Sequence, residues 1–81
     1  MSRILLTGAS GFIGENLLED LLLKRHIVIN IDNNPPRNAF HKQFWHNVNI
    51  NNCAKFKQVI SGFNPDYIIR LLNEIHHQHS R

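Results

Sequence analysis

Residues 7–14 (TGASGFIG) constrain the fold most, because they carry three glycines at every third position. An apolar run at residues 4–6 comes directly before them, and a leucine-rich stretch at residues 17–23 follows. A strand, a glycine turn and a helix in this order form a cradle for phosphate, since the first N–H groups of a helix lack partners inside it and the helix dipole is positive there. Glycine permits the tight turn and has no Cβ to hold a diphosphate away from the backbone. The alternative is a structural turn that binds nothing.

Strand and helix signals alternate along the rest of the chain. The expected strands are residues 3–7, 26–31, 44–48 and 67–72, and the expected helices are residues 12–24 and 53–61. Strands that alternate with helices imply a parallel sheet with right-handed crossovers. We therefore expect an α/β fold, a partial Rossmann sheet of about four strands in the order 3-2-1-4 with flanking helices. We expect this truncated domain to span residues 1–76, followed by a flexible histidine-rich tail at residues 77–81.

Apolar residues fall on one face of each expected helix, which predicts the sides that pack on the sheet. In the first helix these residues are Ile13, Leu17, Leu18 and Leu21. In the second helix they are Phe56, Val59, Ile60 and Phe63. Asn52 is the expected N-cap of the second helix, and Gly62 is expected to end it.

Asp32 comes at the end of the second expected strand, one helix and one strand beyond the glycine turn. A carboxylate at this place can accept hydrogen bonds from both adenosine ribose hydroxyls, and it would repel a 2′-phosphate. The cofactor expected from these residues is therefore NAD rather than NADP. Two alternatives stay open: Asp32 is simply a turn former, or Arg37 in the following loop meets the 2′-phosphate of NADP.

Composition and charge exclude several other classes of function. The net charge is +3, but the basic residues are scattered and form no stripe for nucleic acid. The single cysteine, Cys53, forms neither an internal disulfide nor a cysteine-based zinc site. No apolar run approaches the length of a membrane span, and the N-terminus has no leader pattern, so we expect a cytoplasmic protein without a membrane partner. His76, His77 and His79 are expected to lie in a solvated tail rather than hold a metal.

These motifs resemble the N-terminal part of the NAD-dependent epimerase/dehydratase family, the extended short-chain dehydrogenases/reductases, which mostly act in nucleotide-sugar metabolism. The resemblance rests on residues 5–14, 29–33, 49–52 and 65–73. It implies that Phe12 and Ile13 hold the pyrophosphate through their N–H groups. It also implies an NAD site formed by Gly8, Gly11, Phe12, Ile13, Gly14, Asp32, Asn33, Asn49, Ile50 and Leu71. In this set Asp32 and Asn33 meet the adenosine ribose, Asn49 and Ile50 lie beside the adenine, and Leu71 lines the pocket.

The chain departs from the family pattern at several positions. Asn49 stands where the family often has Asp, and Leu72 and Asn73 stand where it has alanines. The family's catalytic Tyr-x-x-x-Lys pair is not found, because the only tyrosine is Tyr67 and Leu71 follows it four residues later. We expect Tyr67 to be a core residue, and we assign no catalytic residue.

Three functions remain open at this point. The first is an NAD-binding module that is inactive alone, and the second is a subunit of a split enzyme that another chain completes. The third is a non-catalytic interaction or regulatory protein that has kept the fold. We also expect self-association or a completing chain at the edge of the strand at residues 67–72, because an uncovered strand edge favours association.

Overall fold

The computed structural model describes residues 1–71 of the chain. In chain order the elements are β1 (Arg3–Thr7), α1 (Phe12–Leu23), β2 (Ile27–Asp32), the 3₁₀ helix η1 (Ala39–Phe44), β3 (Trp45–Asn47), α2 (Cys53–Phe63) and β4 (Tyr67–Arg70). The four strands form one parallel sheet in the order β3-β2-β1-β4. The expected partial Rossmann fold, with strand order 3-2-1-4, is confirmed.

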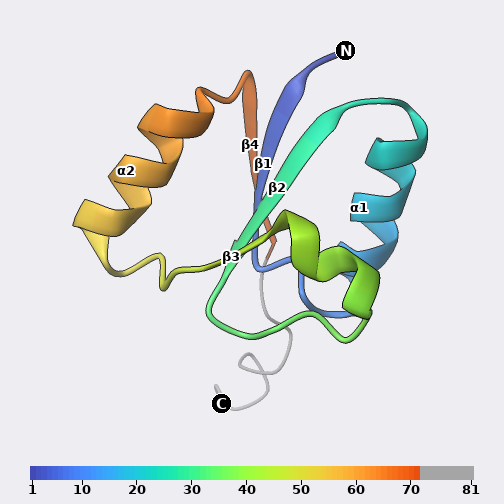
Figure 1. Cartoon of the computed structure of the whole chain (residues 1–81), viewed down its shortest axis with the longest axis horizontal. Coiled ribbons are helices and arrows are strands. Elements are labelled where there is room, and N and C mark those ends of the chain that lie inside the picture. Colours follow the sequence, from blue (N-terminus) through green and yellow to red (C-terminus); the bar gives the residue numbers. More distant parts are fainter. Residues whose placement is uncertain (72–81) are drawn as a thin grey trace, which may run out of the picture.

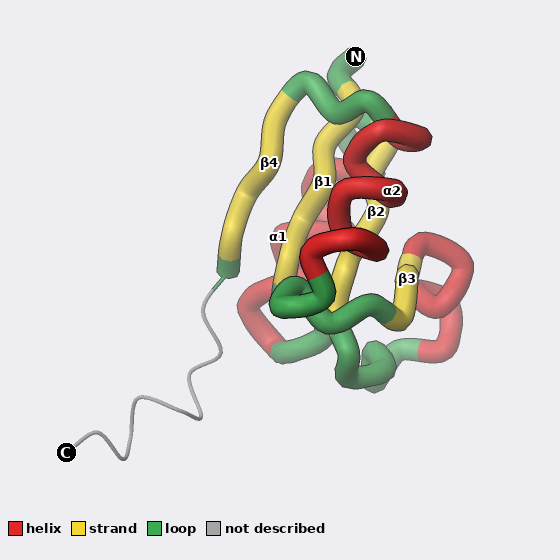
Figure 2. The backbone as a smooth tube through the Cα atoms, turned by 90° about the vertical axis from the view of Figure 1, so that its left-hand side faces the viewer, coloured by secondary structure: helices red, strands yellow, loops and turns green. Residues whose placement is uncertain are grey.

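The two α-helices lie on opposite faces of the sheet, which gives the described part of the chain three layers (Figures 1 and 2). β1 lies between β2 and β4 and is buried from Ile4 to Thr7. Because all strands run in the same direction, their carboxyl ends meet at one edge of the sheet. The glycine turn between β1 and α1 lies at this edge (Figure 1).

A cluster of apolar side chains lies between the sheet and α1. It consists of the buried residues Ile4, Leu6, Ala9, Leu18 and Val28, with partly buried side chains packed around them. Leu5 and Ile31 are also fully buried but do not belong to this cluster. The expectation that Ile13 belongs to the inward face of α1 is wrong, since Ile13 is 64% exposed. Gly14 and Leu18, one helical turn apart, form that face instead, and Ile13 lies to the side of it.

On the other face of the sheet, α2 packs less deeply. The side of α2 predicted from the sequence is the one turned inward, and its members are half-buried: Phe56, Val59, Ile60 and Phe63. No residue of α2 is fully buried. Asn52 is the N-cap as predicted, because its side chain accepts a hydrogen bond from the N–H of Lys55 (3.2 Å).

The two helices end on non-glycine residues in the left-handed region. Arg25 has φ +68° and Asn64 has φ +54°. After α1, the N–H of Arg25 donates to the carbonyl of Leu22 (2.9 Å) and that of His26 to the carbonyl of Leu21 (3.1 Å), which is a Schellman motif. The expectation that Gly62 ends the second helix is wrong: α2 continues through Phe63, and Asn64 caps it.

Several element boundaries differ from the sequence expectations. A 3₁₀ helix, η1, covers Ala39–Phe44, where no helix was expected, and β3 is shorter than predicted. Tyr67 is 62% exposed rather than a core residue, because it lies on β4, which has a neighbouring strand on one side only among residues 1–71. The predicted end of this strand at Leu72, the departure at Asn73 and the tail at residues 77–81 lie outside the described residues.

Candidate functional site

The glycine turn is built against the carboxyl end of β2. β1 and β2 pair in register from Arg3 and Ile27 to Thr7 and Ile31. The N–H of Gly8 continues this pairing into the turn by donating to the carbonyl of Ile31 (3.0 Å). The turn therefore starts as an extension of the sheet before the chain enters α1.

Each glycine of the turn meets a different environment. Gly8 has φ +75°, and a Cβ there would lie 2.7 Å from the carbonyl oxygen of Leu71. A Cβ on Gly14 would lie 2.3 Å from the Cα of Ala9. A Cβ on Gly11 would meet no atom of the protein within 4 Å. Gly8 and Gly14 are thus required by the fold, whereas Gly11 leaves open space beside the start of α1.

The first turn of α1 offers N–H groups without partners. Gly11 is the N-cap, and it makes no side-chain cap hydrogen bond. Within residues 1–71, no hydrogen bond uses the N–H of Phe12 or Ile13. Both residues are largely exposed. Free N–H groups at the positive end of a helix dipole, next to open space at Gly11, fit an anion such as a diphosphate.

Asp32 joins the end of β2 to the glycine turn. One carboxylate oxygen, Oδ2, accepts from the N–H of Ser10 (3.1 Å), and the other, Oδ1, accepts from the N–H of Asn34 (3.0 Å). A carboxylate has about four lone-pair sites, so two acceptor positions remain, enough for two hydroxyl donors. The indole N–H of Trp45 donates to the Asp32 carbonyl oxygen (2.7 Å), which places a fluorescent side chain beside this residue.

A buried polar network, not anticipated from the sequence, holds the turn in place. The side chain of Asn30, itself 1% exposed, accepts from the N–H of Ala9 (3.0 Å) and donates to the hydroxyl of Ser10 (3.2 Å). That hydroxyl donates in turn to the carbonyl of Asn34 (2.7 Å). The signal in the sequence is an amide within the otherwise apolar run of residues 27–31.

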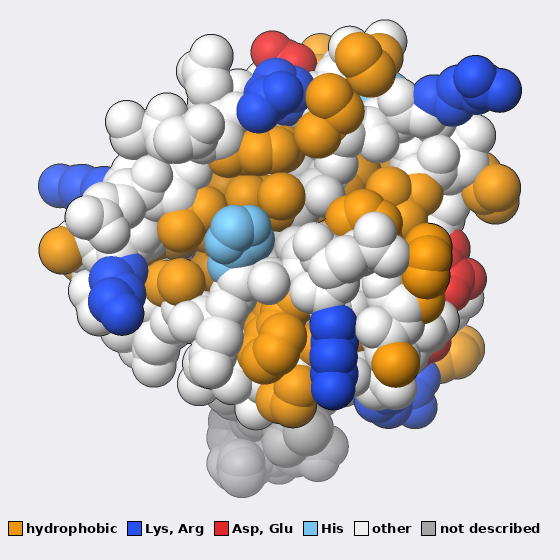
Figure 3. Space-filling view, in the orientation of Figure 1, with side chains coloured by type: hydrophobic (Ala, Val, Ile, Leu, Met, Phe, Trp, Pro, Cys, Tyr) orange, Lys and Arg blue, Asp and Glu red, His pale blue; other side chains and the backbone are white. Residues whose placement is uncertain are grey.

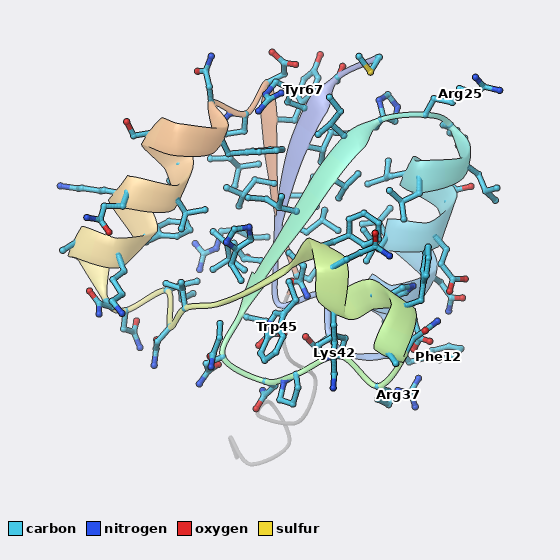
Figure 4. The ribbon with its side chains drawn as sticks, in the orientation of Figure 1. Phe12, Arg25, Arg37, Lys42, Trp45 and Tyr67 are labelled. Carbon is cyan, nitrogen blue, oxygen red and sulfur yellow. The ribbon has the colours of Figure 1, made fainter. Side chains whose placement is uncertain are left out.

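Arg37 pairs with the first turn of α1. Its guanidinium lies 2.8 Å from the Glu15 carboxylate and 6.0 Å from the ring centroid of Phe12. Figure 4 shows Arg37 and Phe12 side by side at the start of the helix. Arg37 therefore lies close to the open N-terminus of α1, where its charge is balanced by Glu15.

The remaining candidate residues follow the other strands. Asn33 and Ile50 are exposed, in the segments that follow β2 and β3. The side-chain oxygen of Asn49 accepts from the N–H of Asn51 (2.8 Å), which forms an Asx turn. The N–H of Leu71 donates to the carbonyl of Thr7 (2.9 Å), so Leu71 lies directly beside Gly8. No hydrogen bond in the described part of the chain joins Asn49 or Ile50 to the glycine turn.

Away from this edge, a hollow of about 280 Å³ lies between α2 and the sheet. It is lined by Arg3, Ile29, His46, Val59, Gly62 and Phe63. Figure 3 shows hydrophobic side chains gathered there beside a histidine.

Among residues 1–71, no group of three or more His, Cys, Asp or Glu side chains is placed to hold a metal ion. Over the same residues, no helix has the length and apolar character of a membrane span. His76, His77 and His79 lie outside this part.

Comparison with known proteins gives a consistent result. Residues 4–81 match the family described as the NAD dependent epimerase/dehydratase family. No curated protein sequence matches the chain. Among solved structures, the UDP-glucose 4-epimerase of Thermus thermophilus, in complex with NAD, is similar with a TM-score of 0.75 and 26% identity over 86% of this chain and 24% of that chain.

Two further solved structures are similar. The UDP-glucose 4-epimerase of Thermotoga maritima, with UDP-glucose, has a TM-score of 0.75 and 25% identity over 86% of this chain and 24% of that chain. The dTDP-glucose 4,6-dehydratase of Bacillus anthracis str. Ames, in complex with NAD, has a TM-score of 0.76 and 23% identity over 94% of this chain and 28% of that chain. This last likeness supports the fold alone. The chain spans about a quarter of the length of these proteins.

Proposed function

Because the chain belongs to the NAD dependent epimerase/dehydratase family, we propose that it binds NAD at the carboxyl edge of its sheet. The observation that carries this proposal is the start of α1. There the N–H groups of Phe12 and Ile13 lack partners within the described residues, and open space adjoins Gly11. The binding of NAD by a similar epimerase supports it.

In this proposal the three parts of the adenosine diphosphate half meet the ends of successive strands. The pyrophosphate contacts the N–H groups of Phe12 and Ile13 in the turn that Gly8, Gly11 and Gly14 make possible. Asp32 and Asn33 meet the ribose hydroxyls. The adenine lies beside Asn49 and Ile50, and Leu71 lines the pocket. The side-chain oxygen of Asn49 already accepts a hydrogen bond from the N–H of Asn51. To accept a second one from the adenine amino group, it has to use its other lone pair or give up the bond to Asn51.

The proposal specifies NAD rather than NADP. The Asp32 carboxylate would repel a 2′-phosphate, and the guanidinium of Arg37 is already paired with Glu15. Titration of the 81-residue chain with each dinucleotide, followed by Trp45 fluorescence and by the melting temperature, tests this. We expect NAD to raise the melting temperature and NADP to raise it less at equal concentration. No change with NAD at millimolar concentration would refute the proposal, and a larger change with NADP would refute its specificity.

We further propose that these 81 residues bind the cofactor without turning over a nucleotide sugar. Bound NAD supplies a nicotinamide ring that accepts a hydride. A base must remove a proton when that hydride leaves, and the family's Tyr-x-x-x-Lys pair does not occur in this sequence. Incubation of the chain with NAD and UDP-glucose should give neither reduced nicotinamide nor an altered sugar. Formation of either product would contradict this part of the proposal.

A second proposal concerns the edge of β4, where the sheet ends within the described residues. Tyr67 is 62% exposed and Ile68 is 47% exposed, which leaves apolar surface on a strand that has one partner, β1. We propose that this edge pairs with a second copy or with a completing chain. Light scattering across a range of concentrations tests self-association, and a monomer at the highest concentration would leave only the completing chain.

A further inference from the structure

We infer that Asn30 is a positioning residue for the proposed dinucleotide site: its buried amide fixes the glycine turn so that the N–H groups of Phe12 and Ile13 stay free for the diphosphate. The inference rests on the proposed function, because it concerns the same site. Asn30 does not itself belong to the proposed contacts, and it acts through Ala9 and Ser10.

The backbone N–H groups of the turn fall into two sets. Those of Gly8, Ala9 and Ser10 all donate to groups at the carboxyl end of β2, at 3.0 to 3.1 Å. Those of Gly11, Phe12 and Ile13 have no partner within residues 1–71. The bonds of the first set hold the turn against β2, and the second set follows directly at the start of α1.

Two of the three donors in the first set, the N–H groups of Ala9 and Ser10, donate to side chains, and Ala9 is the more deeply buried of the two. Ala9 is 1% exposed, so water does not replace a lost partner there. Its acceptor is the amide oxygen of Asn30, which is equally buried. An unpaired buried donor is costly, so loss of this amide should make the peptide before Ala9 turn toward another acceptor. That change would move the backbone leading into α1.

The other half of the amide ties the turn to the loop after β2. The Asn30 Nδ2 donates to the Ser10 hydroxyl, which donates to the carbonyl of Asn34. The N–H of Asn34 returns to the Asp32 carboxylate, and so does the N–H of Ser10. Both bonds to the Asp32 carboxylate come from backbone N–H groups and neither comes from Asn30, so the proposed ribose contact depends less on this amide than the proposed diphosphate contact does.

Asn30→Val tests this role. Valine suits a buried strand and removes both bonds of the amide. We expect the dissociation constants of ADP and NAD to rise about tenfold, since an orienting hydrogen bond is lost. The dissociation constant of adenosine, which lacks the diphosphate, should change less than about twofold. Calorimetry or Trp45 fluorescence measures all three.

Val28→Ala is the matched control. Val28 lies two residues earlier on the same face of β2, is buried and belongs to the apolar core, so its truncation lowers stability without touching the turn. Below its melting temperature this variant should bind ADP as the wild type does. Equal losses for adenosine and ADP in Asn30→Val, or no loss for either, would overturn the inference. A wild-type chain that binds neither ADP nor NAD would instead overturn the proposed function, and the inference with it.

Hydrogen exchange on the wild-type chain gives a second test if Asn30→Val does not fold. In the free protein the amides of Ala9 and Ser10 should exchange slowly, and those of Phe12 and Ile13 should exchange fast. ADP should then slow Phe12 and Ile13 while adenosine does not. Fast exchange at Ala9 in the free protein would show that Asn30 does not hold the turn.

Discussion

At the scale of single residues, the glycines of the turn separate folding from binding. Gly14→Ala would place a Cβ 2.3 Å from the Cα of Ala9, in backbone that cannot move aside easily. We expect it to lower the free energy of unfolding by about 2–4 kcal/mol. Gly11→Ala meets open space and should cost no more than about 1 kcal/mol. Urea denaturation measures both.

Gly11→Ala should weaken the binding of NAD even though it hardly lowers stability. A methyl group at Gly11 enters the space proposed for the diphosphate, so we expect the dissociation constant to rise about tenfold although the protein stays folded. Fluorescence titration of Gly11→Ala below its melting temperature checks this. Wild-type affinity for NAD in Gly11→Ala would place the diphosphate elsewhere.

Arg25 provides a prediction about stability alone. It has φ +68° at the end of α1, a conformation that costs a residue with a Cβ about 1 kcal/mol and glycine much less. We expect Arg25→Gly to raise the free energy of unfolding by about 0.5–1 kcal/mol, with a higher melting temperature. Lys24→Gly, at a C-cap with φ −85°, is the control and should not stabilise the chain.

How far the sequence predicts the site also depends on single residues. The glycine spacing and Asp32 predicted a turn between β1 and α1 and a carboxylate at the end of β2, and both lie there. Asn30 was missed because a polar residue in a strand gives no indication of what its side chain meets. Ile13 was misplaced because helical spacing fits several faces, and the contact of Gly14 with Ala9 selects one of them.

At the scale of elements, the two helices differ in how firmly they are held. α1 contributes Leu18 and Gly14 to buried positions, whereas α2 has no fully buried residue. We expect the amides of α2 to exchange with solvent through local opening, at a lower free energy than those of β1 and β2. Native-state hydrogen exchange measures this directly. Equal protection of α2 and β1 would show that the chain opens only as a whole.

Element prediction from the sequence succeeded where period and composition agree. All four strands and both α-helices were found because apolar runs and amphipathic spacing indicate their type and place, although their ends differ by a few residues. η1 was missed because Pro35 and Pro36, just before it, indicate a loop, and a 3₁₀ turn needs tertiary support. That support includes His41, which is buried and lies 3.1 Å from the Glu19 carboxylate on α1. No local pattern shows this contact.

At the scale of the whole molecule, the edge of β4, at which the sheet ends within the described residues, predicts association. Ile68 is 47% exposed on this strand, and a lysine there adds charge to an edge that another strand would approach. We expect Ile68→Lys to lower any association seen by light scattering while the melting temperature at low concentration changes little. Ser61→Lys, on the exposed side of α2, is the control and should associate as the wild type does.

The pairing of β1 with β4 also decides when the described part of the chain can finish folding. The N–H of Arg3 bonds to the Asp66 carboxylate, across a sequence separation of 63 residues. By contrast, β1, α1 and β2 are consecutive, so they can assemble from neighbouring segments first. Contacts between distant segments slow folding, because a long loop must close before they form. During synthesis, β1 therefore keeps one open side until β4 has left the ribosome.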